Sequence, residues 1–69
     1  MSDLENYEGV MAQPVALKHE VDAYYMKQLG YAQKSVRKII NNMLNEHGLK
    51  PTSSHMFSKK EMNVIRENL

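Results

Sequence analysis

The 69-residue chain contains no cysteine and no tryptophan, and it has only two prolines and three glycines. Without cysteine, neither a disulfide framework nor a cysteine-ligated zinc site can stabilise the fold. No apolar run approaches the length of a membrane span or of a signal-peptide core. These absences predict one small, soluble, cytoplasmic domain without membrane contact, near the size at which a hydrophobic core is only just sufficient.

Side chains suited to catalysis or to metal binding are sparse as well. His19, His47 and His55 have none of the HxxxH or HExxH spacings of a metal site. The acidic residues are too scattered to nominate a paired-carboxylate centre, and no glycine-rich phosphate loop is present. We therefore expect a protein that is not an enzyme and that uses no cofactor and no metal.

The formal net charge is only +1, but the charges are unevenly distributed along the chain. Residues 1–20 sum to −3 and residues 21–69 sum to +4. A basic excess of this size permits binding to nucleic acid without requiring it, because ordinary solvated helix faces often carry as much charge.

Hydrophobic periodicity predicts three main helices. The first is expected from about Val15 to Leu29 and the third over residues 59–69. The second, from about Ala32 to His47, has the clearest pattern. Its apolar stripe at helical spacing consists of Val36, Ile39, Ile40, Met43 and Leu44.

Glycines and caps mark the ends of these helices. Gly30 and Gly48 are well placed to end the first two helices, and Leu49 to complete a Schellman cap. Ser58 and Glu61 have the spacing of a capping box at the start of the third helix. Phe57 and Met62 have the spacing of a hydrophobic staple there, and the expected buried face of that helix is Met62, Ile65 and Leu69.

The fold class that follows is all-α, a compact domain of three to four helices. Residues 1–14 are expected to form an N-terminal arm or a short helix, and residues 15–69 a single helical domain. For the polar stretch before the third helix, a minimal β-wing near residues 52–57 is the alternative to a loop.

Residues 22–44 resemble the helix-turn-helix class of DNA-binding domains. Gly30 is followed six and nine positions later by Val36 and Ile39, which suits the pattern of that class, while Met26 stands where a small residue is typical. In size and style the chain is similar to small phage or plasmid regulators. The resemblance implies DNA binding in transcriptional or recombination control, with the second helix as the recognition helix in the major groove.

The side chains opposite the apolar stripe of the second helix are the candidates for contact with double-stranded DNA. Lysine and arginine neutralise phosphates, and amides read adenine. The candidates on this helix are Gln33, Lys34, Arg37, Lys38 and Asn41. Candidates for flanking phosphate contacts are Lys27, Lys59 and Lys60. An ordinary solvated helix face would show the same pattern.

Tyr24 and Tyr25 suggest an alternative function. Together with Met26 they point in different directions from one helix, so they cannot all enter one small core. We expect one tyrosine to complete the core and the other to lie in a surface contact. The alternative is thus a helical factor that binds a host or phage protein, as an inhibitor or antirepressor. A homodimer is compatible with both functions.

Overall fold

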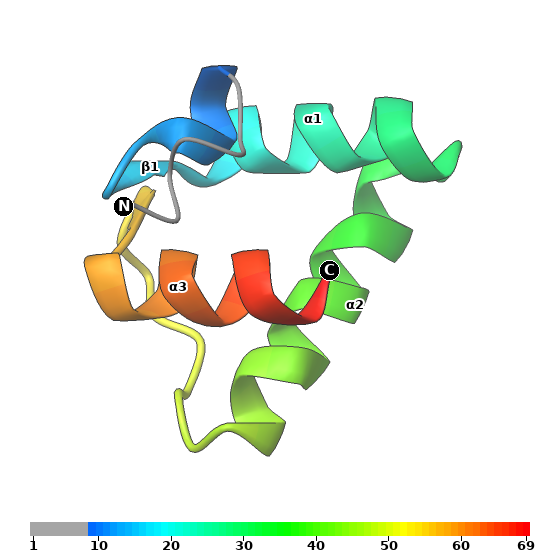
Figure 1. The fold of residues 1–69 in the computed structure, drawn as a ribbon. Coiled ribbons are helices and arrows are strands. Elements are labelled where there is room, and N and C mark those ends of the chain that lie inside the picture. Colours follow the sequence, from blue (N-terminus) through cyan, green and yellow to red (C-terminus); the bar gives the residue numbers. More distant parts are fainter. Residues whose placement is uncertain (1–8) are drawn as a thin grey trace.

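The computed structural model describes residues 9–69 and shows three helices and a very small sheet (Figure 1). The elements in chain order are the 3₁₀ helix η2 (Gly9–Ala12), β1 (Ala16–Leu17), α1 (Lys18–Leu29), α2 (Gln33–Glu46), β2 (Met56–Phe57) and α3 (Lys59–Asn68). The prediction of a mainly helical fold with three principal helices is confirmed. Most of the arm or short helix expected over residues 1–14 lies outside the described residues.

The two strands lie at one end of the molecule, where α1 and α3 both begin. They pair antiparallel, with Ala16 opposite Phe57 and Leu17 opposite Met56. Figure 1 shows α1 and α3 running in the same direction from this sheet, and α2 crossing at their far ends. Because α2 packs against both of the other helices, a core forms among the three.

The predicted start of the first helix is wrong by three residues. Residues 16–17 form β1 instead, and Leu17 has the extended backbone of a strand, with φ −68° and ψ 135°. The backbone N–H of Lys18 donates to the carbonyl oxygen of His55 at 2.8 Å, which extends the pairing into the first residue of α1. The stretch 52–57, for which a minimal β-wing was the alternative to a loop, thus contains the strand β2. Its partner is β1, the segment directly before α1.

The predicted ends of α1 and α2 are confirmed. Gly30 and Gly48 adopt left-handed φ values of 74° and 77°. After α2, the N–H groups of Gly48 and Leu49 donate to the carbonyl oxygens of Asn45 and Leu44 at 3.0 and 2.8 Å. These two bonds are the expected Schellman motif.

The start of α3 also follows the prediction, whereas its end does not. Glu61 N–H donates to the Ser58 hydroxyl at 3.2 Å, and Ser58 N–H donates to the Glu61 carboxylate at 2.8 Å. Phe57 and Met62 are both buried, as a hydrophobic staple requires. The prediction that Leu69 is buried is wrong, because this residue lies beyond the last residue of α3 and is 43% exposed.

The core draws on every element of the described chain. It consists of Met11, Ala16, Val21, Tyr25, Val36, Ile40, Met43, Leu44, Phe57, Met62 and Ile65. Four of the five residues of the predicted α2 stripe are in this core, and Ile39 is half-buried. Because Met11 is fully buried, η2 belongs to the same core. None of the helices within residues 9–69 is long and apolar enough to cross a membrane.

Candidate nucleic-acid interface

The side of α2 that faces away from the core is polar and basic. No acidic residue occurs in α2 before Glu46, at its last position. A shallow depression on this side is lined by Gln33, Lys34, Arg37, Lys38, Asn41 and Asn42. The structure therefore brings all five predicted α2 residues to one surface, with Asn42 in addition.

Two of these side chains are bonded to a buried carboxylate. Asp22, on α1, is fully buried, and the Nε of Arg37 donates to its two oxygens at 3.2 and 2.9 Å. Arg37 Nη2 completes an ion pair with the same carboxylate. Gln33 Nε2 donates to Asp22 Oδ2 at 3.4 Å. Asp22 therefore joins α1 to the first two turns of α2 and fixes the position of the Arg37 guanidinium.

The remaining side chains of the depression are available for a ligand. Within residues 9–69, no hydrogen bond or ion pair engages the side chains of Lys34, Lys38 or Asn41. These three residues follow one another at spacings of four and three, so they form a row along α2. This row can bind a ligand without breaking an interaction that the fold uses.

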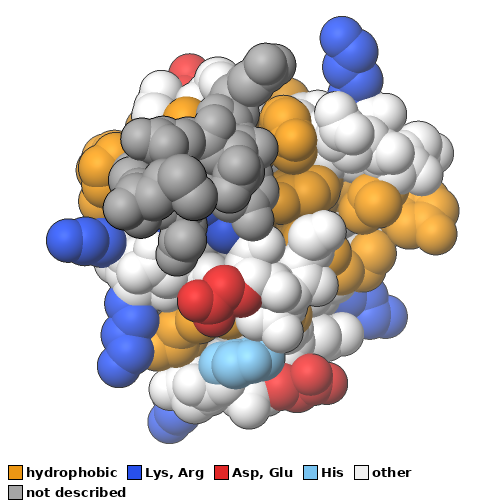
Figure 2. Space-filling model, in the orientation of Figure 1, with side chains coloured by type: hydrophobic (Ala, Val, Ile, Leu, Met, Phe, Trp, Pro, Cys, Tyr) orange, Lys and Arg blue, Asp and Glu red, His pale blue; other side chains and the backbone are white. Residues whose placement is uncertain are grey.

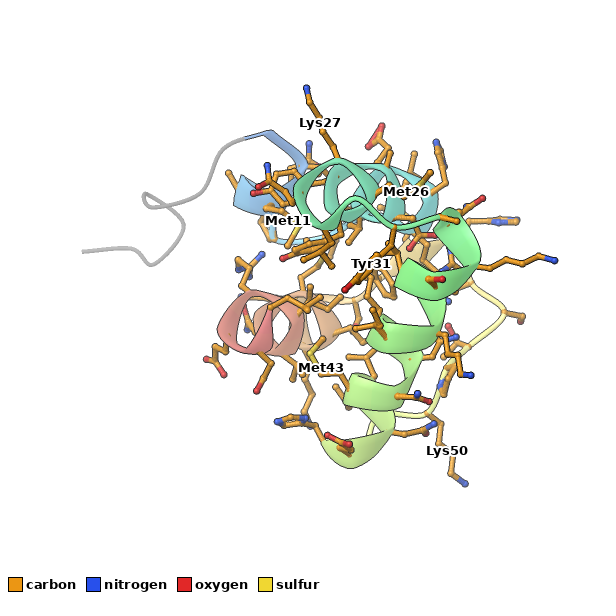
Figure 3. All side chains as sticks on the ribbon, turned by 90° about the vertical axis from the view of Figure 1, so that its right-hand side faces the viewer. Met11, Met26, Lys27, Tyr31, Met43 and Lys50 are labelled. Atoms are coloured by element: carbon orange, nitrogen blue, oxygen red, sulfur yellow. The ribbon has the colours of Figure 1, made fainter. Side chains whose placement is uncertain are left out.

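The three flanking lysines predicted to contact phosphates do not line this depression. Lys27 points away from the body of the molecule on the outer side of α1 (Figure 3). Lys59 is exposed in the first turn of α3. Lys60 lines a separate, largely apolar groove with Val15 and Met56. The structure thus groups the α2 candidates but leaves these lysines on other surfaces.

The two tyrosines of the alternative function have different environments. Tyr25 is part of the core and only 5% exposed, while Tyr24 is half-buried and meets the Tyr25 ring edge to face at 4.9 Å. Tyr24 also lines a shallow pocket with the exposed Leu29 and Leu69. Figure 2 shows hydrophobic side chains gathered on that side of the molecule, around the C-terminal end of α1. The apolar surface at the C-terminal end of α1 is therefore formed by Leu29 and Leu69 as much as by Tyr24.

Lys18 is a second charged residue that the fold buries. It is only 7% exposed, and its Nζ donates to the Thr52 carbonyl oxygen at 2.7 Å and to the Thr52 hydroxyl at 3.3 Å. The ammonium also lies 5.5 Å from the centre of the Phe57 ring. Lys18 therefore attaches the loop before β2 to the start of α1.

The roles of Asp22 and Lys18 are not among the predictions from the sequence, although the spacing of these residues carries a signal. Lys18, Val21, Asp22 and Tyr25 are separated by three, one and three residues, which places them on one face of a helix. A charged residue on the same face as a core residue needs a partner, because burying an isolated charge is costly. Within residues 9–69, no group of three acidic or histidine side chains is placed to hold a metal ion.

No protein family, curated protein or solved structure with which the chain was compared matches it.

Proposed function

We propose that this protein binds double-stranded DNA, with α2 as the helix that enters the major groove, and that it acts as a small regulator of transcription or recombination. The observation that carries the proposal is the depression on α2, which three cationic and three amide side chains line without a carboxylate. Such a surface complements phosphates and the polar edges of bases.

The connection between α1 and α2 supports the same proposal. Only residues 30–32 join the two helices, and Gly30 supplies the left-handed conformation that ends α1 abruptly. A short turn of this kind, between two helices that pack against each other, is the arrangement by which helix-turn-helix proteins present their second helix to DNA. The bonds from Asp22 to Gln33 and Arg37 add rigidity where the N-terminal half of α2 would approach the bases.

Within this proposal the side chains of α2 divide into two groups. Lys34 and Lys38 supply positive charge for phosphates, and Asn41 supplies an amide that can pair with adenine. Gln33 and Arg37 have part of their hydrogen-bonding capacity already used by Asp22. We therefore assign the first contacts to the unengaged row and a supporting contact to the exposed end of Arg37.

The test is a salt titration of binding to mixed-sequence duplex DNA, comparing the natural chain with the double variant Lys34→Ala/Lys38→Ala. Removing one phosphate contact reduces the slope of log K against log salt by about 0.9. The slope should therefore become shallower by about 1.8 in the double variant. Circular dichroism should show an unchanged helical spectrum, because both lysines are exposed.

The matched control is Lys27→Ala/Lys59→Ala, which removes the same charge from residues outside the depression. This control should retain most of the salt dependence. Equal losses in the two double variants would mean that binding depends on overall charge rather than on α2. If the natural chain did not bind duplex DNA at low salt, the proposed function would be wrong.

One observation favours a protein partner as the second candidate. Leu29, Tyr31 and Leu69 are all at least 40% exposed near the C-terminal ends of α1 and α3. A host or phage protein could cover this apolar surface, as could a second copy of the chain. A homodimer would also suit DNA binding, because one recognition helix reads only a few base pairs.

A further inference from the structure

A second polar cavity lies beside Arg37, between the start of α1 and the loop that precedes β2. It is lined by Lys18, His19, Arg37, Thr52, Ser53, Ser54 and His55. Of these seven side chains, two are cationic, two are imidazoles and three carry hydroxyl groups, and none is a carboxylate. We call this site the His19–His55 cavity.

Among residues 9–69, the buried lysine of this cavity has no acidic partner. Its ammonium has three N–H donors, and the two acceptors that it meets both belong to Thr52. The only ion pair within residues 9–69 joins Arg37 to Asp22, so no carboxylate there neutralises Lys18. A buried positive charge with neutral partners favours an anion in the adjacent cavity.

Arg37 adds a second positive group whose outer end is unused. Its Nε and Nη2 donate to Asp22, while Nη1 makes no hydrogen bond with any residue of the described chain. The side chain is 35% exposed and lines both this cavity and the depression on α2. The guanidinium is therefore fixed at the boundary between the two sites.

The hydroxyl groups of the loop are arranged to donate rather than to accept. The Thr52 hydroxyl oxygen accepts from Lys18 and from the Ser54 N–H at 3.3 Å, and the Ser54 hydroxyl oxygen accepts from the Met56 N–H at 3.2 Å. Because both oxygens are already acceptors, their protons are left for another acceptor. The cavity thus offers donors and lacks a competing carboxylate.

We propose that the His19–His55 cavity binds a phosphate group, and that on DNA this is a backbone phosphate beside the groove that α2 enters. A phosphate suits the site because it presents several acceptor oxygens to the surrounding imidazole, guanidinium and hydroxyl groups. The assignment to DNA rests on the proposed function, whereas the affinity for phosphate does not.

The first arm of the test titrates inorganic phosphate into the full chain and follows the backbone amide resonances by NMR, with chloride at the same ionic strength as the reference. The amides of Ser53, Ser54 and His55 should shift saturably with phosphate and not with chloride. The double variant His19→Ala/His55→Ala should bind phosphate about tenfold more weakly, as expected for the loss of charge-assisted hydrogen bonds.

This variant spares Lys18 and Arg37, whose contacts stabilise the fold, and changes two exposed side chains. The control is His47→Ala, which alters an exposed histidine at the end of α2 that does not line the cavity. The control should bind phosphate like the natural chain. Absence of saturable shifts with phosphate, or equal binding by all three proteins, would overturn the proposed site.

The second arm measures duplex DNA binding by the same variants. Loss of the hydrogen bonds to one backbone phosphate should weaken duplex binding by His19→Ala/His55→Ala about tenfold while leaving that of His47→Ala unchanged. Phosphate binding with unaltered DNA binding would overturn the DNA assignment and identify a site for free phosphate. Because Lys34 and Lys38 do not line this cavity, the double lysine variant still tests the proposed function when the phosphate site fails.

Discussion

At the scale of single residues, Asp22 positions two side chains of the candidate interface without being part of its surface. Its carboxylate is fully buried and receives bonds from Gln33 and Arg37, one turn apart on α2. A buried charge is tolerated only when it is paired and hydrogen-bonded. Arg37 therefore has a structural role, the pairing of the buried Asp22 carboxylate, in addition to any contact with a ligand.

The substitution Arg37→Leu tests this structural role. Within the described part of the chain, this substitution leaves the buried Asp22 carboxylate with one weak partner, Gln33 at 3.4 Å. We expect the free energy of unfolding to fall by about 3 kcal/mol, the low end for breaking a buried pair, because a third of the Arg37 side chain is exposed. Urea unfolding at constant m-value measures the change in stability.

The double variant Arg37→Leu/Asp22→Asn is the control for this prediction. Removing the charge from position 22 should recover part of the stability that Arg37→Leu loses, because the unpaired buried carboxylate is then gone. A double variant no more stable than Arg37→Leu alone would show that poorer packing, rather than the unpaired Asp22 carboxylate, causes the loss of stability.

At the scale of elements, the helix ends are set by local chemistry. Gly30 and Gly48 adopt left-handed conformations at the ends of α1 and α2, and Ser58 with Glu61 caps α3. These ends determine how short the connection between α1 and α2 can be. They therefore determine how the depression on α2 is presented beside α1.

The substitution Gly30→Ala tests the turn between α1 and α2. A Cβ at this position meets no heavy atom within 4 Å, so the only cost is the left-handed backbone at φ 74°. We expect the free energy of unfolding to fall by about 1 kcal/mol, measured by the shift in the urea midpoint. Gly30→Asn should lose less stability, because asparagine tolerates this conformation better. Equal losses in both variants would point to a cause other than backbone strain.

At the scale of the whole molecule, contacts between distant segments connect the helices. β1 and β2 pair the starts of α1 and α3 across about forty residues of sequence. Arg66, on α3, is nearly buried, and its Nη1 donates to the carbonyl oxygens of Met11 and Gln13 at 3.3 and 3.1 Å. These bonds attach η2 to α3 and help to keep Met11 in the core.

The substitution Arg66→Met tests this attachment while keeping an apolar stem of similar length. The amide of Gln13, which donates to the Val10 carbonyl oxygen at 3.2 Å, should exchange with solvent about tenfold faster. Hydrogen exchange by NMR measures this rate, with the α2 amides, expected to be little changed, as the internal reference. Uniform acceleration in all helices would mean that Arg66 supports global stability instead of local attachment of η2.

The sequence alone determined the parts of this protein that depend on neighbouring residues. The apolar stripe of α2, its Schellman cap, the capping box of α3 and the left-handed glycines all follow from spacings of a few residues. Helical periodicity also separates the polar side of α2 from its buried side. For this reason the sequence was sufficient to group the five α2 candidates on one surface.

Which of those candidates are already engaged depends on how the helices pack. The pairing of β1 with β2, the bonds of Asp22 to Arg37 and Gln33, and the contact of Lys18 with Thr52 join residues 11 to 41 positions apart. No local pattern specifies such partners, because a buried charge can be satisfied by any donor or acceptor that the packing of the helices brings near it. The helices therefore followed from the sequence, whereas the division of their polar side chains between structure and binding followed from how the helices pack.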